Sequence, residues 1–164
     1  MTKLRVFPDT GVLLSMIVFP VGQRGKPTLA GEVLSLYDEG LFDLVISQTV
    51  EEELLGVIRE EFSDAYTRVL TFLAPLAPQF SRKPTPEEVA AAFPYTVDPN
   101  DAPIFAAAVV ARPDVVLSND FKTFHTEKAK SYWKRHGIQI ESLYGLLCVF
   151  GRRQRRPSQR TRRN

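Results

Sequence analysis

Short apolar segments with the character of β-strands alternate with helix-like segments along this chain. The strand-like segments cover residues 4–7, 42–47, 115–118 and 138–140. A helix that crosses from one strand to the next brings consecutive strands into parallel alignment. The sequence therefore predicts an α/β fold, a three-layer sandwich with a central, mostly parallel sheet of about four to five strands flanked by helices. The length of 164 residues suits one such domain.

Acidic residues stand where two of these strands end. Asp9 comes directly after the first strand, and Asp120 follows the third strand after Asn119. Ligands of open α/β sheets bind beyond the carboxyl ends of the strands. If the first and third strands are neighbours, Asp9 and Asp120 lie on the two lips of one crevice.

Further acids lie on helices that could border this crevice. Asp101 falls in the first turn of a predicted helix that begins at Asp98. On the predicted helix 49–61, Glu51 and Glu53 flank the apolar stripe. The helical periodicity does not choose between these two glutamates.

Acids gathered in one crevice have a chemical consequence. Like charges raise one another's pKa, so the cluster is costly unless a cation offsets it. Mg²⁺ and Mn²⁺ are hard cations that take oxygen ligands, together with water and substrate phosphate. Such ions activate water and stabilise the leaving oxygen in phosphodiester hydrolysis. The acids therefore predict a nuclease that depends on Mg²⁺ or Mn²⁺.

Each acid also has a purely structural interpretation. Asp9 can cap the helix that follows it, and Asp120 can be a turn residue. Asp101 interacts favourably with the dipole of its helix without any further role. Asp98 is expected as an N-cap that is close enough in sequence to bind an ion indirectly. The isolated His125 is expected in a surface or packing role.

Charge divides the chain into two parts. Seven of the 21 Lys and Arg residues lie in 152–164, which leaves 14 against all 19 acids in residues 1–151, a balance of −5. We therefore predict a nuclease domain over residues 1–151 and a basic, arginine-rich tail over 152–164. Such a tail can neutralise RNA phosphates, and the alternative is a solvated tail without a dedicated partner. The basic residues that we assign to nucleic-acid binding are Lys122, Arg152, Arg153, Arg155 and Arg156.

Cysteine content and apolar segments indicate the compartment. Cys148 is the only cysteine, which excludes an intramolecular disulfide and fits a reducing environment. The apolar run 12–19 is interrupted by Ser15 and is far shorter than the ~20 residues that span a bilayer. No clear small-residue cleavage site follows it. We expect a cytoplasmic protein without a membrane partner.

The acidic motifs resemble those of PIN-domain nucleases, a family that includes many toxin ribonucleases of bacterial toxin–antitoxin pairs. Asp9-Thr10-Gly11 resembles the family's strand end Asp-Thr-Asn, and residues 47–54 resemble its Ser-Pro-like strand end followed by a Glu-Leu pair. Asp98-Pro99-Asn100-Asp101 resembles its Asp-Pro-Asp-Asp-like helix start. Ser118-Asn119-Asp120 resembles its Thr-Gly-Asp-like strand end, so the motifs occur in the family's order.

The resemblance covers about residues 4–147, and it leaves two departures. Gly11 replaces the usual asparagine, and the arginine-rich tail is not part of the pattern. The resemblance implies four catalytic, metal-binding acids and two supporting hydroxyl groups, namely Asp9, Glu53, Asp101 and Asp120, with Thr10 and Ser118.

The resemblance also implies an activity and partners. It implies an endoribonuclease that hydrolyses RNA phosphodiester bonds with Mg²⁺ or Mn²⁺, frequent homodimers and, for a toxin, an antitoxin protein as partner. One alternative is a PIN-like RNA-binding module without catalysis, which Gly11 in place of asparagine allows. A phosphoacceptor receiver is a weaker alternative, because Glu141 and Ser142 follow the last predicted strand where such a domain needs a lysine.

Overall fold

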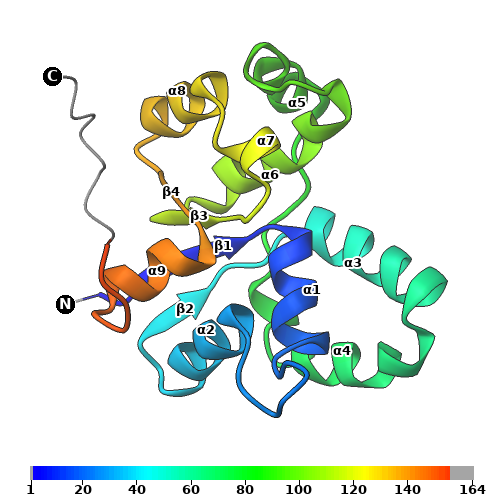
Figure 1. Cartoon of the computed structure of the whole chain (residues 1–164). Coiled ribbons are helices and arrows are strands. Elements are labelled where there is room, and N and C mark those ends of the chain that lie inside the picture. The colour runs from blue at the N-terminus through cyan, green and yellow to red at the C-terminus, as the bar shows by residue number, and fades with distance from the viewer. Residues whose placement is uncertain (1, 156–164) are drawn as a thin grey trace, which may run out of the picture.

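The computed structural model of this protein describes residues 2–155, and its centre is a parallel β-sheet (Figure 1). Within these residues the sheet has four strands in the order β2-β1-β3-β4. The strands are β1 (Leu4–Pro8), β2 (Phe42–Leu44), β3 (Val115–Leu117) and β4 (Gln139–Glu141). Neighbouring strands run parallel, and β1 lies beside β3. The predicted α/β fold with a central parallel sheet is confirmed.

Helices cover both faces of this sheet (Figure 1). In the described residues they are α1 (Thr10–Val18), α2 (Leu29–Asp38), α3 (Gln48–Glu61), α4 (Tyr66–Leu73), α5 (Pro86–Ala92), α6 (Ala102–Ala111), α7 (Phe121–Phe124), α8 (Glu127–Arg135) and α9 (Leu143–Val149). Helices α1, α2 and α9 pack together on one side of the sheet, and α6, α7 and α8 lie on the other. None of these helices, over residues 2–155, combines the length and apolarity needed to cross a membrane.

Local sequence signals explain how the layers form. Val6 and Phe7 of β1 are both fully buried, as expected for a central strand whose alternate side chains face two covered layers. The side-chain oxygens of Thr28, Ser47 and Thr126 each accept a hydrogen bond from the backbone N–H three residues later. These caps satisfy a donor at the start of α2, α3 and α8 and fix where each helix begins.

Strand β2 is shorter than the sequence predicted. We expected a strand over residues 42–47, whereas β2 ends at Leu44. Beyond that point Ile46 O accepts a hydrogen bond from Ser81 N, and Gln48 N donates to Ser81 O. The end of the predicted strand therefore pairs with a distant segment, and Ser47 becomes the N-cap of α3.

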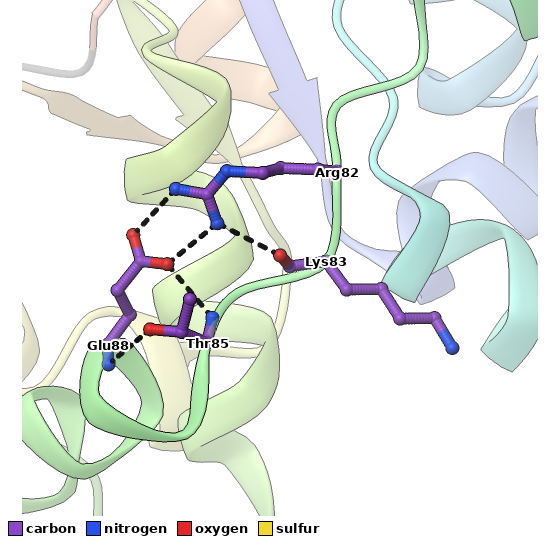
Figure 2. Close-up of polar contacts among 4 residues, drawn as sticks. All are labelled: Arg82, Lys83, Thr85 and Glu88. Carbon is purple, nitrogen blue, oxygen red and sulfur yellow. Dashed lines mark hydrogen bonds and ion pairs between the residues drawn. The ribbon is translucent and has the colours of Figure 1, made fainter.

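Arg82 and Lys83, which follow Ser81, form ion pairs with two different helices. Arg82 donates to both carboxylate oxygens of Glu88 on α5, at 2.7 and 3.2 Å, and Glu88 forms a capping box with Thr85 (Figure 2). The hydrogen bond from Arg82 is the main reason that the pKa of Glu88 is lowered to about 2. The side chain of Lys83 points away from this group, and its Nζ lies 2.5 Å from Oε1 of Glu52 on α3. The segment thus links α5 to the helix that carries Glu53.

The chain beyond α9 lies against the acidic body. The first arginines of the tail form ion pairs with N–O distances of 2.8, 2.8 and 3.0 Å, namely Arg152–Glu39, Arg153–Glu32 and Arg155–Glu141. Tyr144 Oη donates to the backbone oxygen of Gln154 at 2.8 Å. Arg156 and the rest of the predicted tail lie outside the described residues.

Candidate functional site

The four acids predicted from the sequence line one pocket of about 270 Å³, which we call the acid pocket. Asp9 follows β1 and Asp120 follows β3, so two neighbouring strands bring these acids together. Glu53 comes from α3, and Asp101 comes from a 3₁₀ turn, Pro99–Asp101, that precedes α6. The acids therefore meet beyond the carboxyl ends of β1 and β3, where an open α/β sheet binds ligands.

Asp9 is the most buried of these acids, with 7% of its surface exposed. Its Oδ1 accepts a hydrogen bond from Val12 N at 2.7 Å, which caps α1, and its Oδ2 accepts one from the hydroxyl of Ser118. Burial raises the pKa of Asp9 to about 6, although the two hydrogen bonds oppose this rise. The charges of Asp120 and Glu53 raise the pKa further. Asp9 is thus both a helix cap and an acid of the pocket.

Ser118 connects the two strand-end acids. Its side chain is fully buried, and its hydroxyl donates to Asp9 Oδ2 while Oγ accepts from Asp120 N at 3.0 Å. One hydroxyl therefore positions a carboxylate from the β1 end and the backbone of the turn after β3.

Asp120 and Asp101 differ in what else they do. Oδ1 of Asp120 accepts from Thr123 N at 3.2 Å, so Asp120 also caps the short helix α7. Asp101 occupies the N-cap position of α6 but makes no side-chain capping hydrogen bond there. Asp98 caps the 3₁₀ turn that precedes α6, by accepting from Asn100 N at 2.9 Å. Burial, followed by the charges of Asp98 and Asp120, raises the pKa of Asp101. The carboxylate of Asp101 therefore has no capping role that competes with a ligand.

The structure distinguishes the glutamates at the start of α3. Glu53 lines the acid pocket, Glu51 does not, and Glu52 is paired with Lys83. Thr49 also lines the pocket, which sequence reasoning did not anticipate. Thr49 and Glu53 are four residues apart, which places both on one face of the helix. This spacing could have predicted from the sequence that Thr49 lies at the pocket.

Other residues of the site were not anticipated from the sequence. Asn100 and Phe124 line the acid pocket. His125 does more than pack, because its Nε2 lies 2.8 Å from the backbone oxygen of Ser118. Lys122 is exposed on α7 and does not line the acid pocket, and its assignment to nucleic-acid binding stays a prediction.

The donor set of the acid pocket is chemically suited to a hard divalent cation. The carboxylates supply oxygen ligands only, and Thr10, which also lines the pocket, has a buried hydroxyl oxygen without a hydrogen-bond partner among the described residues. Within residues 2–155, however, no group of three Asp, Glu, His or Cys side chains is arranged so that it could hold one metal ion. The residue types fit Mg²⁺ or Mn²⁺, while their spacing here does not define a coordination shell.

Comparison with known proteins places this geometry in a family. The family described as the PIN domain matches residues 5–122, a span that contains β1 from its second residue, β2, β3 and the four acids of the pocket. No curated protein and no solved structure matched the chain. The family match spans more than half of the sequence and includes the acids that line the pocket. This chain belongs to the PIN-domain family.

Proposed function

We propose that this protein is a metal-dependent endoribonuclease that hydrolyses RNA phosphodiester bonds. The observation that carries the proposal is the presence of Asp9, Glu53, Asp101 and Asp120 in one pocket. These acids come from segments far apart in sequence, so their meeting is a property of the whole fold. The PIN domain adds a fold of the nuclease type around that pocket.

The proposed roles follow from the contacts of each side chain. We assign Asp9, Asp101 and Asp120 as the ligands of Mg²⁺ or Mn²⁺, which requires these carboxylates to move closer together when the ion binds. Glu53 would bind the ion through water or hold a second one. When bound, such an ion activates a water molecule and stabilises the leaving oxygen. Ser118 orients the Asp9 carboxylate and favours its charged form by donating a hydrogen bond to Oδ2.

Partners and location are part of the same proposal. We propose RNA as the substrate and a homodimer as the assembly, which light scattering on the purified protein would test. As the toxin of a toxin–antitoxin pair, the protein would have an antitoxin protein as a further partner. The single cysteine supports a cytoplasmic location.

The substitution Asp9→Asn tests the activity. We expect purified wild-type protein to cleave a labelled RNA pool with Mn²⁺ and to stop when EDTA is added. Asp9→Asn removes the central charge while it keeps the side chain's size, so cleavage should be lost and the circular dichroism spectrum preserved. Asp64→Asn is the matched control, because Asp64 is exposed and does not line the acid pocket. Wild-type cleavage by Asp9→Asn would overturn the proposal.

A non-catalytic RNA-binding module is the second candidate. The observation that favours it is that no three acids of residues 2–155 are arranged to hold an ion together. For such a module, the RNA pool should bind equally well with Mn²⁺ and with EDTA and should remain intact in both.

A further inference from the structure

A second pocket shares the short helix α7 with the acid pocket. Its volume is about 680 Å³. Asp120 and Phe124 line the acid pocket, whereas Phe121 and His125 line the second pocket. Because α7 contributes a side chain to each pocket, the two pockets are neighbours, and one extended polymer could occupy both.

The second pocket contains an exposed aromatic platform. Phe121 is 58% exposed, although a phenylalanine ring is usually buried. Its ring stacks on His125, with centroids 4.3 Å apart and an interplanar angle of 30°. His125 is held in turn by the hydrogen bond between Nε2 and Ser118 O. Because a carbonyl oxygen only accepts, Nε2 carries the proton in this bond.

This arrangement fixes the platform relative to the acids. The residue that holds His125 by its backbone, Ser118, holds Asp9 by its side chain. The position of the Phe121 ring is thus coupled to the acid pocket through one residue. An exposed ring held in this way offers a surface on which an unpaired nucleobase can stack.

Basic side chains line the same pocket. Lys130 Nζ lies 3.8 Å from Glu127, and the guanidinium of Arg155 lies 3.0 Å from Glu141 Oε1. Both cations are at least half exposed in their side chains. Pairing with a glutamate lowers the free charge that each cation offers to a phosphate. An ammonium nevertheless has three donors and a guanidinium five, so each keeps donors available for a phosphate. Aromatic stacking beside cations is the usual combination in sites for single-stranded nucleic acid.

We propose that the second pocket is a subsite for an unpaired RNA nucleotide next to the scissile phosphate. The base stacks on Phe121, and Lys130 and Arg155 bind the adjoining phosphates. A base inside a duplex has both faces covered by its neighbours, so the subsite selects single-stranded RNA over duplex RNA. This inference rests on the proposed nuclease function, because that function places a phosphate in the acid pocket.

Binding measured without cleavage tests the subsite. The probe is a short fluorescein-labelled oligouridylate in EDTA, and the readout is fluorescence anisotropy with the full chain. We expect Phe121→Ala to weaken binding by roughly tenfold, because stacked bases contribute that much on alanine substitution. Phe121→Trp should retain binding, since it keeps an aromatic face. Binding of a fully paired RNA duplex should change little in either variant.

Matched controls separate stacking from general damage. Phe93→Ala removes another exposed phenylalanine that lines neither pocket, so it should leave the affinity unchanged. Lys130→Ala should weaken binding more than Lys128→Ala, because Lys128 lies on the same helix but does not line the pocket. Equal affinity of Phe121→Ala and wild type for the oligouridylate would overturn the subsite, as would an equal loss for duplex RNA.

Cleavage with Mn²⁺ then distinguishes the two proposals. If wild type cleaves and Phe121→Ala shows an unchanged KM, the nuclease stands and the subsite fails. If wild type does not cleave but Phe121→Ala still loses single-strand binding, the subsite stands and the nuclease fails. The expected result is cleavage by both proteins, with the KM of Phe121→Ala raised and its kcat nearly unchanged.

Discussion

Asp9 experiences opposite effects on its charge. Burial disfavours the carboxylate, while hydrogen bonds from Ser118 and Val12 favour it. Burial is the larger effect, and the pKa rises from 3.8 to about 6. A side chain with this pKa is ionised at neutral pH at the expense of fold stability, and a cation in the acid pocket would offset that cost.

The raised pKa of Asp9 predicts how stability depends on pH. Between about pH 4 and pH 6 the folded chain keeps a proton on Asp9 that the unfolded chain has lost, so stability falls as the pH rises through this window. The full cost, about 3 kcal/mol of unfolding free energy, is present above pH 6. Asp9→Asn in EDTA should therefore match wild type near pH 4 and be more stable at pH 7.

Urea titrations of both proteins across this range measure the effect. Added Mn²⁺ should raise the stability of wild type and leave that of Asp9→Asn nearly unchanged. If the stability of the two proteins changed in parallel from pH 4 to pH 7, ionisation of Asp9 would have no cost to the free energy of unfolding, which would contradict this prediction.

At the scale of the elements, Gly11 in α1 and Gly31 in α2 differ in the space that is available for a Cβ atom. A Cβ on Gly11 would lie 3.7 Å from Asp9 Oδ1, which is ordinary contact. A Cβ on Gly31 would lie 1.8 Å from the backbone oxygen of Pro20, which cannot be relieved without moving the chain. A hydrogen bond from Thr28 N to Pro20 O, at 3.1 Å, also holds the Pro20 backbone close to the start of α2. Helix α2 therefore needs Gly31 for its close contact with the loop after α1.

We expect substitutions of these two glycines to act in opposite directions. Gly31→Ala should lower the free energy of unfolding by about 1 to 3 kcal/mol, because it overpacks against backbone. Gly11→Ala should raise it by a few tenths to about 1 kcal/mol, because alanine is the better helix former and has room. The same space accepts asparagine, so Gly11→Asn should fold. Chemical denaturation checks all three, and a stabilised Gly31→Ala would contradict the packing described here.

At the scale of the whole molecule, a basic C-terminal segment meets an acidic body. Residues 1–151 carry the excess of acids, and Arg152 and Arg153 pair with Glu39 and Glu32 of that body. A paired arginine contributes less free charge to an RNA than an unpaired one. The ion pairs therefore reduce what these two arginines can add to nucleic-acid binding.

Salt dependence of RNA binding tests the role of the tail. Each phosphate neutralised on a single strand contributes a slope of roughly −0.7 to a plot of log affinity against log salt. Deleting residues 152–164 should flatten this slope. Mn²⁺-dependent cleavage should persist with a raised KM, because the deletion also removes Arg155 from the second pocket. The double substitution Arg152→Ser and Arg153→Ser should change the slope much less than the deletion. An unchanged slope after deletion would exclude the tail as a binding arm.

The sequence by itself determined the local features of this protein. Apolar periodicity indicated the strands and helices, and the caps at Asp9 and Asp98 depend on hydrogen bonds to residues only a few positions away. The α/β class follows from the order of these elements. Which acids belong together was predictable, but only the family resemblance selected Glu53 over Glu51.

Only the tertiary structure decided the contacts between distant segments. Asp9 and Ser118 are 109 positions apart, and their hydrogen bond exists because β3 lies beside β1. The same holds for Ser81, whose backbone forms hydrogen bonds with Ile46 and Gln48, around the end of the predicted second strand. The placement of Phe121 over His125 likewise depends on the turn after β3, where Ser118 O holds the imidazole. Periodicity and capping involve residues within one or two helical turns of each other, so the sequence reveals them. A pocket forms where the ends of distant strands meet, and this depends on how the crossover connections arrange those strands in space.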